Sequence, residues 1–424
     1  MILQDHPTPR RGILSWALFD FANTAFYVVV LTVGYPTYFR RIVAGSSDQA
    51  DFWWGLSFSI SMAVVALLAP VLGAVADSGT GKKRFLAFFT GMCVAATGLL
   101  YFIESSMIFQ GMVLLIVANI GFEAGLVFYD AFLPEITTER HYGRVSGYGF
   151  SMGYVGSLVT LGIAFPLYAG GFDAGNLVNI RTSFVLAAAL FAVFSLPLFI
   201  VLKEQRASLR FRAEMIRTGF ARVGSTIREI SAYSNIGRFL VAYFLYIDAV
   251  NTIIIFSGIF ALETLGMDLS EIVVFFAMVQ TSAIFGSAAF GRLADRFGQK
   301  RTLTLTLLLW MAIITTAFLV EDVTTFYLVG ILAGVALGSS QSVSRSLMSH
   351  LTPPEKKTEF FGFYSFFGKA AAILGPVIFG YVASQTNQRA AILSVGILLL
   401  AGLALLQRVH DPTADLRARR ATDG

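Results

Sequence analysis

Twelve long apolar runs divide this chain and limit its possible folds more than any other feature. Each is about as long as the 20 or so residues that a helix needs to cross a bilayer. The runs cover residues 13–39, 52–76, 85–103, 107–133, 145–168, 183–202, 239–262, 272–293, 303–320, 326–347, 360–383 and 391–406. The sequence therefore predicts an all-α membrane protein with 12 transmembrane helices.

The composition agrees with that class. The chain is 56% hydrophobic and 13% charged, whereas soluble domains have about 45–50% and about 25%. The chain has a single cysteine, Cys93, inside an apolar run. A single cysteine excludes an intramolecular disulfide and a cysteine metal cluster. The first run is too long for the apolar part of a signal peptide, so we expect it to be the first membrane span.

A basic stretch separates the first six runs from the last six. It carries Lys203 and seven arginines up to Arg238, with apolar residues at near-helical spacing between them (Leu209, Met215, Ile216, Phe220 and Val223). We expect a six-helix bundle at 1–203, a cytoplasmic linker at 204–235, and a second bundle with a cytoplasmic tail at 236–424. The linker pattern predicts an amphipathic helix on an anionic leaflet, and a solvated tether is the alternative.

The lysines and arginines predict the orientation in the membrane. Of 31, 25 lie in the tails and in alternate connections, and four lie in the remaining loops (Arg40, Arg41, Arg181 and Arg389). Because positive residues collect on the cytoplasmic side, we expect a multi-pass protein of the cytoplasmic (inner) membrane with both termini in the cytoplasm.

Two matching polar stripes interrupt the first run of each half. Asp20 is followed by Asn23 and Thr24, and Asp248 is followed by Asn251 and Thr252. Spacings of three and four residues place each set on one helical face. An acid inside a span costs about 2.5–3.5 kcal/mol by insertion scales, so it normally faces a partner or a cavity. We therefore expect the stripes to line facing walls of a central polar cavity in a transporter.

A second repeated pattern follows the second and the eighth runs. Its complete copy contains Gly291, Asp295, Arg296, Gly298 and Arg301. The earlier copy contains Gly73, Asp77, Lys83 and Arg84, but Ser78 stands where the later copy has Arg296, and one extra residue precedes Gly81. Two similar halves in one orientation form a parallel repeat about an axis along the membrane normal.

The complete copy, Gly-x-x-x-Asp-Arg-x-Gly-x-Lys-Arg, resembles the signature loop of the major facilitator superfamily. Three further stretches narrow the resemblance: residues 16–23 (Trp-Ala-Leu-Phe-Asp-Phe-Ala-Asn), residues 242–248, and residues 341–347 with 359–364. They are similar to the family typified by the autophagy-related vacuolar amino-acid effluxer, in its bacterial "unknown major facilitator" branch. The resemblance covers nearly the whole chain. It implies a major facilitator fold of two six-helix bundles and, more weakly, amino-acid efflux, because substrates diverge within one fold.

In that fold, the first, fourth, seventh and tenth helices line the cavity, and polar residues of this chain fall on them. They are Asp20, Asn23, Thr24 and Tyr27 on the first, Glu123, Tyr129 and Asp130 on the fourth, Asp248, Asn251 and Thr252 on the seventh, and Gln341, Ser344 and Arg345 on the tenth, with Lys369 on the eleventh. The resemblance makes the two repeated Gly/Asp loops inner-gate elements, with Asp77 and Asp295 in loop and helix-end contacts.

The candidate chemistry is proton coupling and recognition of a zwitterion. A carboxylate in a low-dielectric cavity can exchange a proton near neutral pH, and we expect Glu123 or Asp20 to do so. Arg345 or Lys369 would hold a substrate carboxylate, while Asp248 holds an ammonium group. Structural alternatives remain: Asp20 and Asp248 as bonds between helices, Asp130 and Arg345 as gate contacts, and Lys369 in an ion pair.

The sequence favours a transporter over other classes. The four histidines lie in tails or inner connections, and we find no catalytic triad or phosphate-loop pattern, so we expect no enzyme, no cofactor and no soft-metal site. We also expect no nucleic-acid partner, and a monomer in the bilayer. Proton-coupled export of amino acids is the leading hypothesis. Export of amphipathic compounds or lipids, and a non-transporting sensor or scaffold that binds a partner through its linker, are the alternatives.

Overall fold

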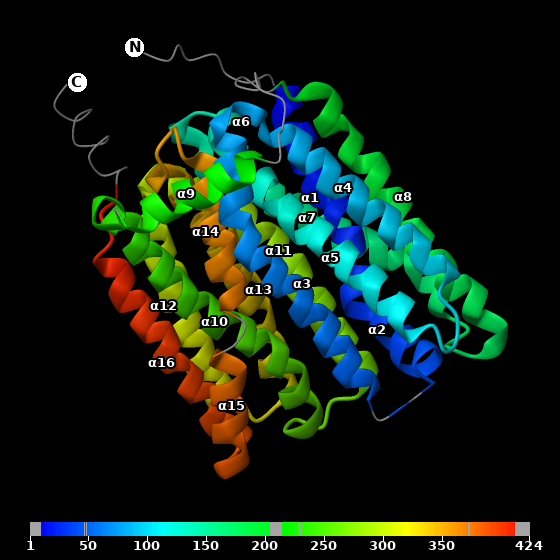
Figure 1. Cartoon of the computed structure of the whole chain (residues 1–424). Coiled ribbons are helices and arrows are strands. Elements are labelled where there is room, and N and C mark those ends of the chain that lie inside the picture. The colour runs from blue at the N-terminus through cyan, green and yellow to red at the C-terminus, as the bar shows by residue number, and fades with distance from the viewer. Residues whose placement is uncertain are drawn as a thin grey trace. The chain divides into compact units, whose positions relative to one another are not determined.

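The computed structural model describes residues 10–45, 47, 49–203, 214–228, 230–371 and 374–411. Every element in them is helical (Figure 1). The α-helices are α1 (Arg10–Phe26), α2 (Gly34–Tyr38), α3 (Ala50–Val75), α4 (Lys82–Leu99), α5 (Ile108–Asp130), α6 (Leu133–Ile136), α7 (Tyr142–Tyr168), α8 (Leu177–Val201), α9 (Glu214–Arg228), α10 (Ser234–Glu263), α11 (Leu269–Phe297), α12 (Gln299–Leu319), α13 (Val323–Leu351), α14 (Lys357–Ala370), α15 (Leu374–Gln385) and α16 (Gln388–Gln407).

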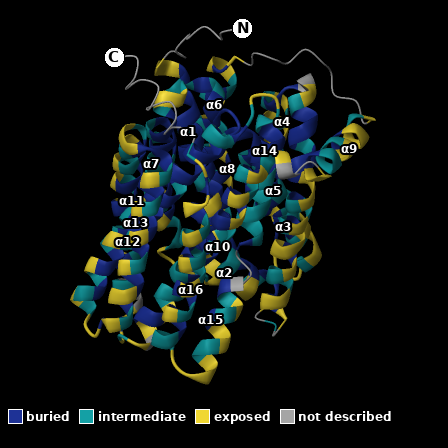
Figure 2. Cartoon of the chain, turned by 90° about the vertical axis from the view of Figure 1, so that its left-hand side faces the viewer, coloured by how far each residue is buried: buried dark blue, intermediate teal, exposed yellow. Residues whose placement is uncertain are grey.

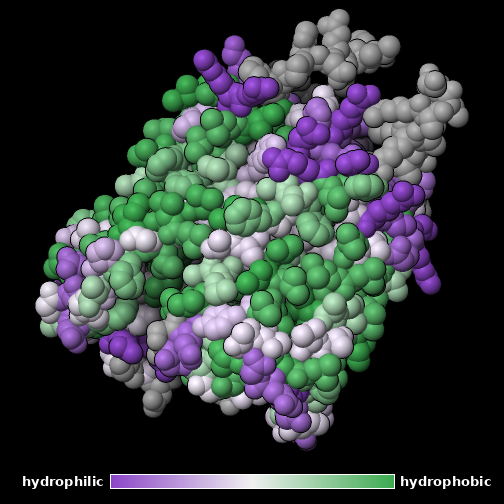
Figure 3. All heavy atoms as spheres, turned by 180° about the vertical axis from the view of Figure 1, so that it is seen from behind, coloured by the Kyte–Doolittle hydropathy of each residue, from purple (hydrophilic) through white to green (hydrophobic). Residues whose placement is uncertain are grey.

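Within the described residues, 12 helical stretches are long and apolar enough to span a membrane. They are Arg10–Val43, Ala50–Ser78, Lys82–Phe102, Ile108–Ile136, Glu139–Tyr168, Ala174–Val201, Ser234–Leu262, Glu271–Phe297, Gln299–Leu319, Val323–Leu351, Lys357–Gln385 and Gln388–Gln407. The prediction of 12 transmembrane helices is confirmed. On the face seen in Figure 3, hydrophobic residues predominate and hydrophilic residues gather toward the ends of the helices.

In the eleventh span, α14 ends at Ala370, with Ala371 in a turn, and α15 begins at Leu374. Residues 372 and 373 lie outside the described residues. The first span also changes its winding, because π-helical turns at Tyr27–Val33 and Phe39–Val43 follow α1. Such turns inside transmembrane helices are frequent at functional sites.

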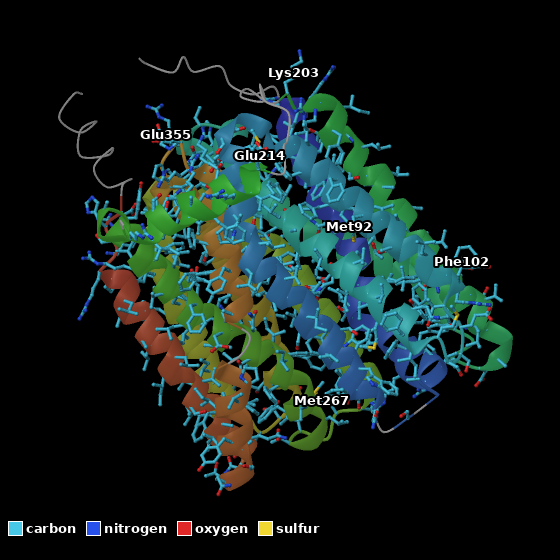
Figure 4. The ribbon with its side chains drawn as sticks, in the orientation of Figure 1. Met92, Phe102, Lys203, Glu214, Met267 and Glu355 are labelled. Atoms are coloured by element: carbon cyan, nitrogen blue, oxygen red, sulfur yellow. The ribbon has the colours of Figure 1, made fainter. Side chains whose placement is uncertain are left out.

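The described residues form two compact units. The N-terminal unit contains residues 10–132 and 152–222, and the C-terminal unit contains residues 133–151 and 223–411. The segment 133–151 precedes the linker in sequence, yet it packs with α11 and α13 of the C-terminal unit. In Figure 4, Lys203 and Phe102 lie at opposite ends of the N-terminal unit, and Glu355 and Met267 at opposite ends of the C-terminal unit.

Both units use the same helix packing. In the N-terminal unit α1 packs on α8, α3 on α5, and α4 on both α5 and α8. In the C-terminal unit α10 packs on α16, α11 on α13, and α12 on both α13 and α16. Counted by span within each half, these are the same four pairs. The repeat seen in the sequence is therefore a repeat of packing.

A pair of lysines illustrates this repeat at the level of single contacts. Lys83 Nζ donates to the carbonyl of Leu202 after α8 over 2.5 Å, and Lys300 Nζ donates to the carbonyl of Gln407 at the end of α16 over 2.7 Å. Each lysine lies in the first turn of the third helix of its half, and satisfies a terminal carbonyl of the sixth. The two basic loops thus hold the ends of equivalent helices.

Side-chain caps fix the start of three helices of the C-terminal unit. Asp268 and Glu271 form a capping box at the start of α11, Asp322 accepts from Thr325 N at the start of α13, and Asn387 accepts from Ala390 N at the start of α16. The backbone N–H of Thr325 holds the pKa of Asp322 below its ordinary value. In Figure 2, buried and exposed residues alternate along α12 and α16, as expected of helices with one packed face.

The helix predicted for the basic linker is confirmed where the structure describes it. The helix α9 falls inside the predicted linker, whereas residues 204–213, which include Arg206 and Leu209, lie outside the described residues. Its position on a leaflet stays a prediction.

Candidate functional site

In the N-terminal unit, Asp20 is the centre of a hydrogen-bonded cluster. Its side chain is buried within the first span, with 7% of the residue exposed. The hydroxyl of Tyr129 donates to Asp20 Oδ2 over 2.7 Å, and Asn23 Nδ2 donates to Oδ1 over 3.3 Å. The structure thus brings together three predicted site residues from α1 and α5. Because both carboxylate oxygens accept hydrogen bonds, the acid is compatible with its apolar surroundings.

Aromatic stacking positions the Tyr129 ring. The rings of Tyr129 and Trp16 stack with centroids 4.6 Å apart and planes within 10°, and Phe19 stacks on Tyr129 at 4.9 Å. Trp16 Nε1 also donates to the carbonyl of Tyr129 over 3.1 Å. The sequence identified Trp16 only through the family resemblance, yet it connects α1 to the end of α5. A tryptophan one helical turn before an intramembrane acid was the available signal.

The remaining predicted residues of this unit lie in different surroundings. Glu123 is buried on α5, with 4% of the residue exposed, whereas Tyr27 is 49% exposed at the start of the first π-helical turn. The hydroxyl of Thr24 donates to the carbonyl of Phe21 over 2.9 Å, within its own helix. A Cβ at Gly156 of α7 would lie 2.6 Å from Thr24 Oγ1, so this glycine permits α7 to approach the polar stripe closely.

In the C-terminal unit, Asp248 bonds to the start of a helix. The residue is fully buried, and its Oδ2 accepts the backbone N–H of Gly375, in the first turn of α15, over 2.8 Å. Among the described residues, Asp248 Oδ1 has no hydrogen-bond partner. An anionic group is favourable at the amino end of a helix, where backbone N–H groups have no intrahelical acceptor. Asp248 therefore satisfies one of the donors that the interruption in the eleventh span leaves free.

The close contact between α10 and α15 depends on the absence of a side chain at Gly375. A Cβ there would lie 2.0 Å from Thr252 Oγ1, and the hydroxyl of Thr252 donates to the carbonyl of Asp248 over 2.8 Å. Asn251 is half-buried beside them. We did not predict Gly375, although the Gly375-Pro376 pair inside an apolar run was a signal of an interrupted helix.

Arg345 contacts α7. It is 1% exposed; its Nε donates to Ser146 Oγ over 3.0 Å and its Nη2 to the Ser146 carbonyl over 2.9 Å. Its guanidinium carbon lies 4.0 Å from the centre of the Phe150 ring. These contacts agree with the alternative in which Arg345 is an interface residue. Gln341 and Lys369 are half-buried, and Lys369 lies in the last turn of α14.

The complete gating loop also contacts α7. Asp295 accepts the backbone N–H of Gly143 over 2.7 Å and that of Arg144 over 3.1 Å, and Arg144 Nε donates to Asp295 Oδ2 over 2.9 Å. A Cβ at Gly291 would lie 2.4 Å from the carbonyl of Gly143, so α11 and α7 meet backbone to backbone. The carboxylate caps the amino end of α7, as the helix-end role predicts.

The other gating residues lie around these contacts. Gly298 has a φ of 106°, a conformation that favours glycine, between α11 and α12. The guanidinium carbon of Arg296 lies 5.3 Å from the Phe297 ring centre, and Arg301 is exposed. In the earlier copy, Gly73 is buried, Asp77 is half-buried and Arg84 is exposed. The partners Gly143, Arg144 and Ser146 were not predicted, because they lie more than 150 residues from their contacts.

Each unit holds a buried acid, Asp20 or Asp248, beside hydroxyl groups inside apolar spans. Intramembrane acids of this kind are typical of substrate and ion pathways. Among the described residues, no group of three or more His, Cys, Asp or Glu side chains could hold a metal ion.

Comparisons with known proteins agree with this interpretation. A family model described as "Vacuole effluxer Atg22 like" matches residues 54–416. An uncharacterized MFS-type transporter of Bacillus subtilis, YxiO, is 33% identical over 408 residues, which are 94% of this chain and 95% of the relative. Autophagy-related protein 22 of Kluyveromyces lactis is 22% identical over 366 residues, covering 78% of this chain and 74% of the relative.

A solved structure has the same fold. The human organic anion transporter MFSD10 (TETRAN) aligns with a TM-score of 0.75 at 15% identity, over 95% of this chain and all of the human chain. The resemblance drawn from the sequence is confirmed: the protein is an MFS-type transporter and not an enzyme. The chain belongs to the family of Atg22-like vacuole effluxers.

Proposed function

We propose that this protein is a secondary active transporter that exports amino acids or similar small zwitterions across the cytoplasmic membrane. The observation that carries the proposal is the pair of buried acids, Asp20 and Asp248, at matching positions in the first helix of each half. An intramembrane acid is expensive to bury, so a matched pair favours a role in the transport path. In this proposal the protein works as a monomer with both termini in the cytoplasm and needs no cofactor.

The repeated helix packing supports transport by alternating access. Parallel repeats let two bundles rock around a site near the middle of the bilayer, with largely rigid bundles.

Protons are the proposed coupling ion. Protonation of Asp20 would replace an acceptor oxygen by a donor hydroxyl and weaken its bond with Tyr129. Glu123, six residues before Tyr129 on α5 and equally buried, is the second candidate carrier. Asp20 lies on α1 and Glu123 lies on α5, so a change in the protonation of either acid would act directly on the helix that carries it.

Both cations named from the sequence keep their proposed role. Arg345 contacts Ser146 and Phe150, and Lys369 lies half-buried at the end of α14. Either side chain would hold the substrate carboxylate. We retain Asp248 as the partner of the substrate ammonium, because among the described residues its buried Oδ1 has no hydrogen-bond partner, while Oδ2 caps α15.

Flux measurements in proteoliposomes test this function. Purified protein should move labelled amino acids faster when a pH gradient is imposed, and Glu123→Gln should abolish the effect of the gradient. Glu104→Gln is the matched control, because Glu104 is an exposed acid of the same unit, paired with Arg181. Lys369→Met should raise KM for amino acids more than Lys369→Arg does. Equal, gradient-independent flux across a broad amino-acid panel would contradict the proposal.

A further inference from the structure

A groove at one end of the C-terminal unit is lined by cations. It has a volume of about 610 Å³ and lies between the start of α12 and the end of α16. Its lining includes Lys300, Arg301, Thr304, Arg408, His410 and Asp411. None of these residues belongs to the polar stripes inside the spans, although Arg301 also belongs to the complete copy of the gating loop.

Hydrogen bonds hold the two walls of the groove together. Lys300 Nζ donates to the carbonyl of Gln407 over 2.7 Å, and Gln407 Nε2 donates to Thr304 Oγ1 over 3.1 Å. Asn235 of α10 fixes the far wall, because its side chain donates to the carbonyl of His410 over 2.9 Å and accepts the His410 N–H over 2.7 Å. The groove is therefore formed before any ligand arrives, which lowers the entropic cost of binding.

The groove carries more positive than negative charge. Lys300, Arg301 and Arg408 are cationic at neutral pH, and the lining contains one acid, Asp411. Arg301 and Arg408 are exposed, and they approach the groove from different helices. A guanidinium group presents paired N–H donors that match the oxygens of a phosphate group.

The position of the groove identifies the source of such a phosphate. Its walls are the ends of two transmembrane spans, Gln299–Leu319 and Gln388–Gln407. Side chains at the end of a span lie at the level of the lipid headgroups, and basic pockets between transmembrane helices bind anionic headgroups. We propose that this groove binds the phosphodiester of an anionic phospholipid and so anchors α12 to α16 at the membrane surface.

The test measures lipid binding directly. The purified full chain is placed in nanodiscs of phosphatidylcholine, with and without phosphatidylglycerol, and retained lipid is counted by native mass spectrometry. Arg301→Ala and Arg408→Ala should each weaken phosphatidylglycerol binding about fivefold, which corresponds to about 1 kcal/mol per cation near the surface. Arg301→Lys and Arg408→Lys should retain most of the binding because they keep the charge.

Arg238→Ala is the matched control. Arg238 is an exposed cation at the start of α10 in the same unit, and it does not line the groove. An equal loss of phosphatidylglycerol in this variant would overturn the proposal, because it would show binding to general surface charge. A second measurement compares thermal stabilisation by glycerol phosphate or inorganic phosphate, added to phosphatidylcholine nanodiscs, with stabilisation by phosphatidylglycerol. Equal stabilisation would also overturn the proposal, because it would identify a soluble phosphate as the ligand.

Discussion

Tyr129→Phe tests whether the Asp20 cluster is held by a charge-assisted hydrogen bond. The substitution removes only the hydroxyl that donates to Asp20 Oδ2 over 2.7 Å. The ring keeps its stacking on Trp16 and Phe19, at 4.6 and 4.9 Å between centroids. The change therefore leaves no large cavity and does not release the ring, so its effect reports on the bond.

The structure sets the size of the expected loss. Tyr129 is fully buried, and its acceptor is a carboxylate; hydrogen bonds to charged groups contribute about 1.5–3 kcal/mol to stability. Asn23 still donates to the other carboxylate oxygen over 3.3 Å, so Asp20 is not left without a donor. We therefore expect the free energy of unfolding to fall by about 2 kcal/mol, near the middle of that range.

Tyr38→Phe is the control. Tyr38 lies in the same unit, is 1% exposed, and donates over 2.8 Å to the carbonyl of Ile103, a neutral acceptor. Its loss should lower the free energy of unfolding by about 0.5–1.5 kcal/mol. The assay is reversible unfolding of the purified variants in mixed micelles, followed by circular dichroism. The reasoning is refuted if Tyr129→Phe is no more destabilising than Tyr38→Phe, or if its effect and that of Asp20→Asn add within about 0.5 kcal/mol in the double variant.

Three further predictions use the same reasoning. Gly375→Ala places a Cβ 2.0 Å from Thr252 Oγ1 and should lower stability by about 1–3 kcal/mol, whereas Gly380→Ala on the same helix, with nothing within 4 Å, should raise the unfolding midpoint slightly. Asp295→Asn turns an acceptor toward a donor at the amino end of α7, so it should destabilise by about 1.5–3 kcal/mol, while Asp51→Asn, which changes an exposed ion pair with Arg40, should have little effect. Spin labels at 216, 220 and 227 of α9, in a Cys93→Ala background, should be accessible to oxygen in anionic bilayers, and labels at 221 and 225 to water-soluble quenchers. The exposed Ile216, Phe220 and Ile227 share one side of the helix, and uniform accessibility would indicate the solvated tether.

The spans could be predicted because hydrophobicity acts on each run separately. A run of about 20 apolar residues has one stable solution in a bilayer, so no partner has to be known. The interruption between α14 and α15 could not be read from the same property. Residues 360–383 are apolar throughout apart from a few positions, and what tolerates the interruption is the carboxylate of Asp248 on another helix, 127 residues away.

The partners of the polar residues show the same limit. The sequence identified Asp20 and Tyr129 separately as residues of the first and fourth helices, and the structure joins them. It also identified Arg345, but its partner Ser146 is a small residue in a run that gives no reason to select it. A polar side chain inside an apolar span indicates that a hydrogen-bond partner is present, but helix packing determines which residue that partner is.

The two matched acids are equivalent in sequence and different in environment. Asp20 is held by side-chain donors, a phenol and an amide, whereas Asp248 is held by the backbone N–H of an interrupted helix. A rotamer change of the acid can break either kind of bond. The donors to Asp20 can also rotate away, whereas the donor to Asp248 is a backbone group held in α15. Replacing each acid by leucine should separate the two cases. Asp248→Leu removes the acceptor of the Gly375 N–H and should lower the protection of that amide from hydrogen exchange. Asp20→Leu should leave the protection of the α5 backbone unchanged, because the donors to Asp20 are side chains. A similar loss of amide protection in both variants would contradict this difference, because it would show that both acids stabilise the backbone of a neighbouring helix.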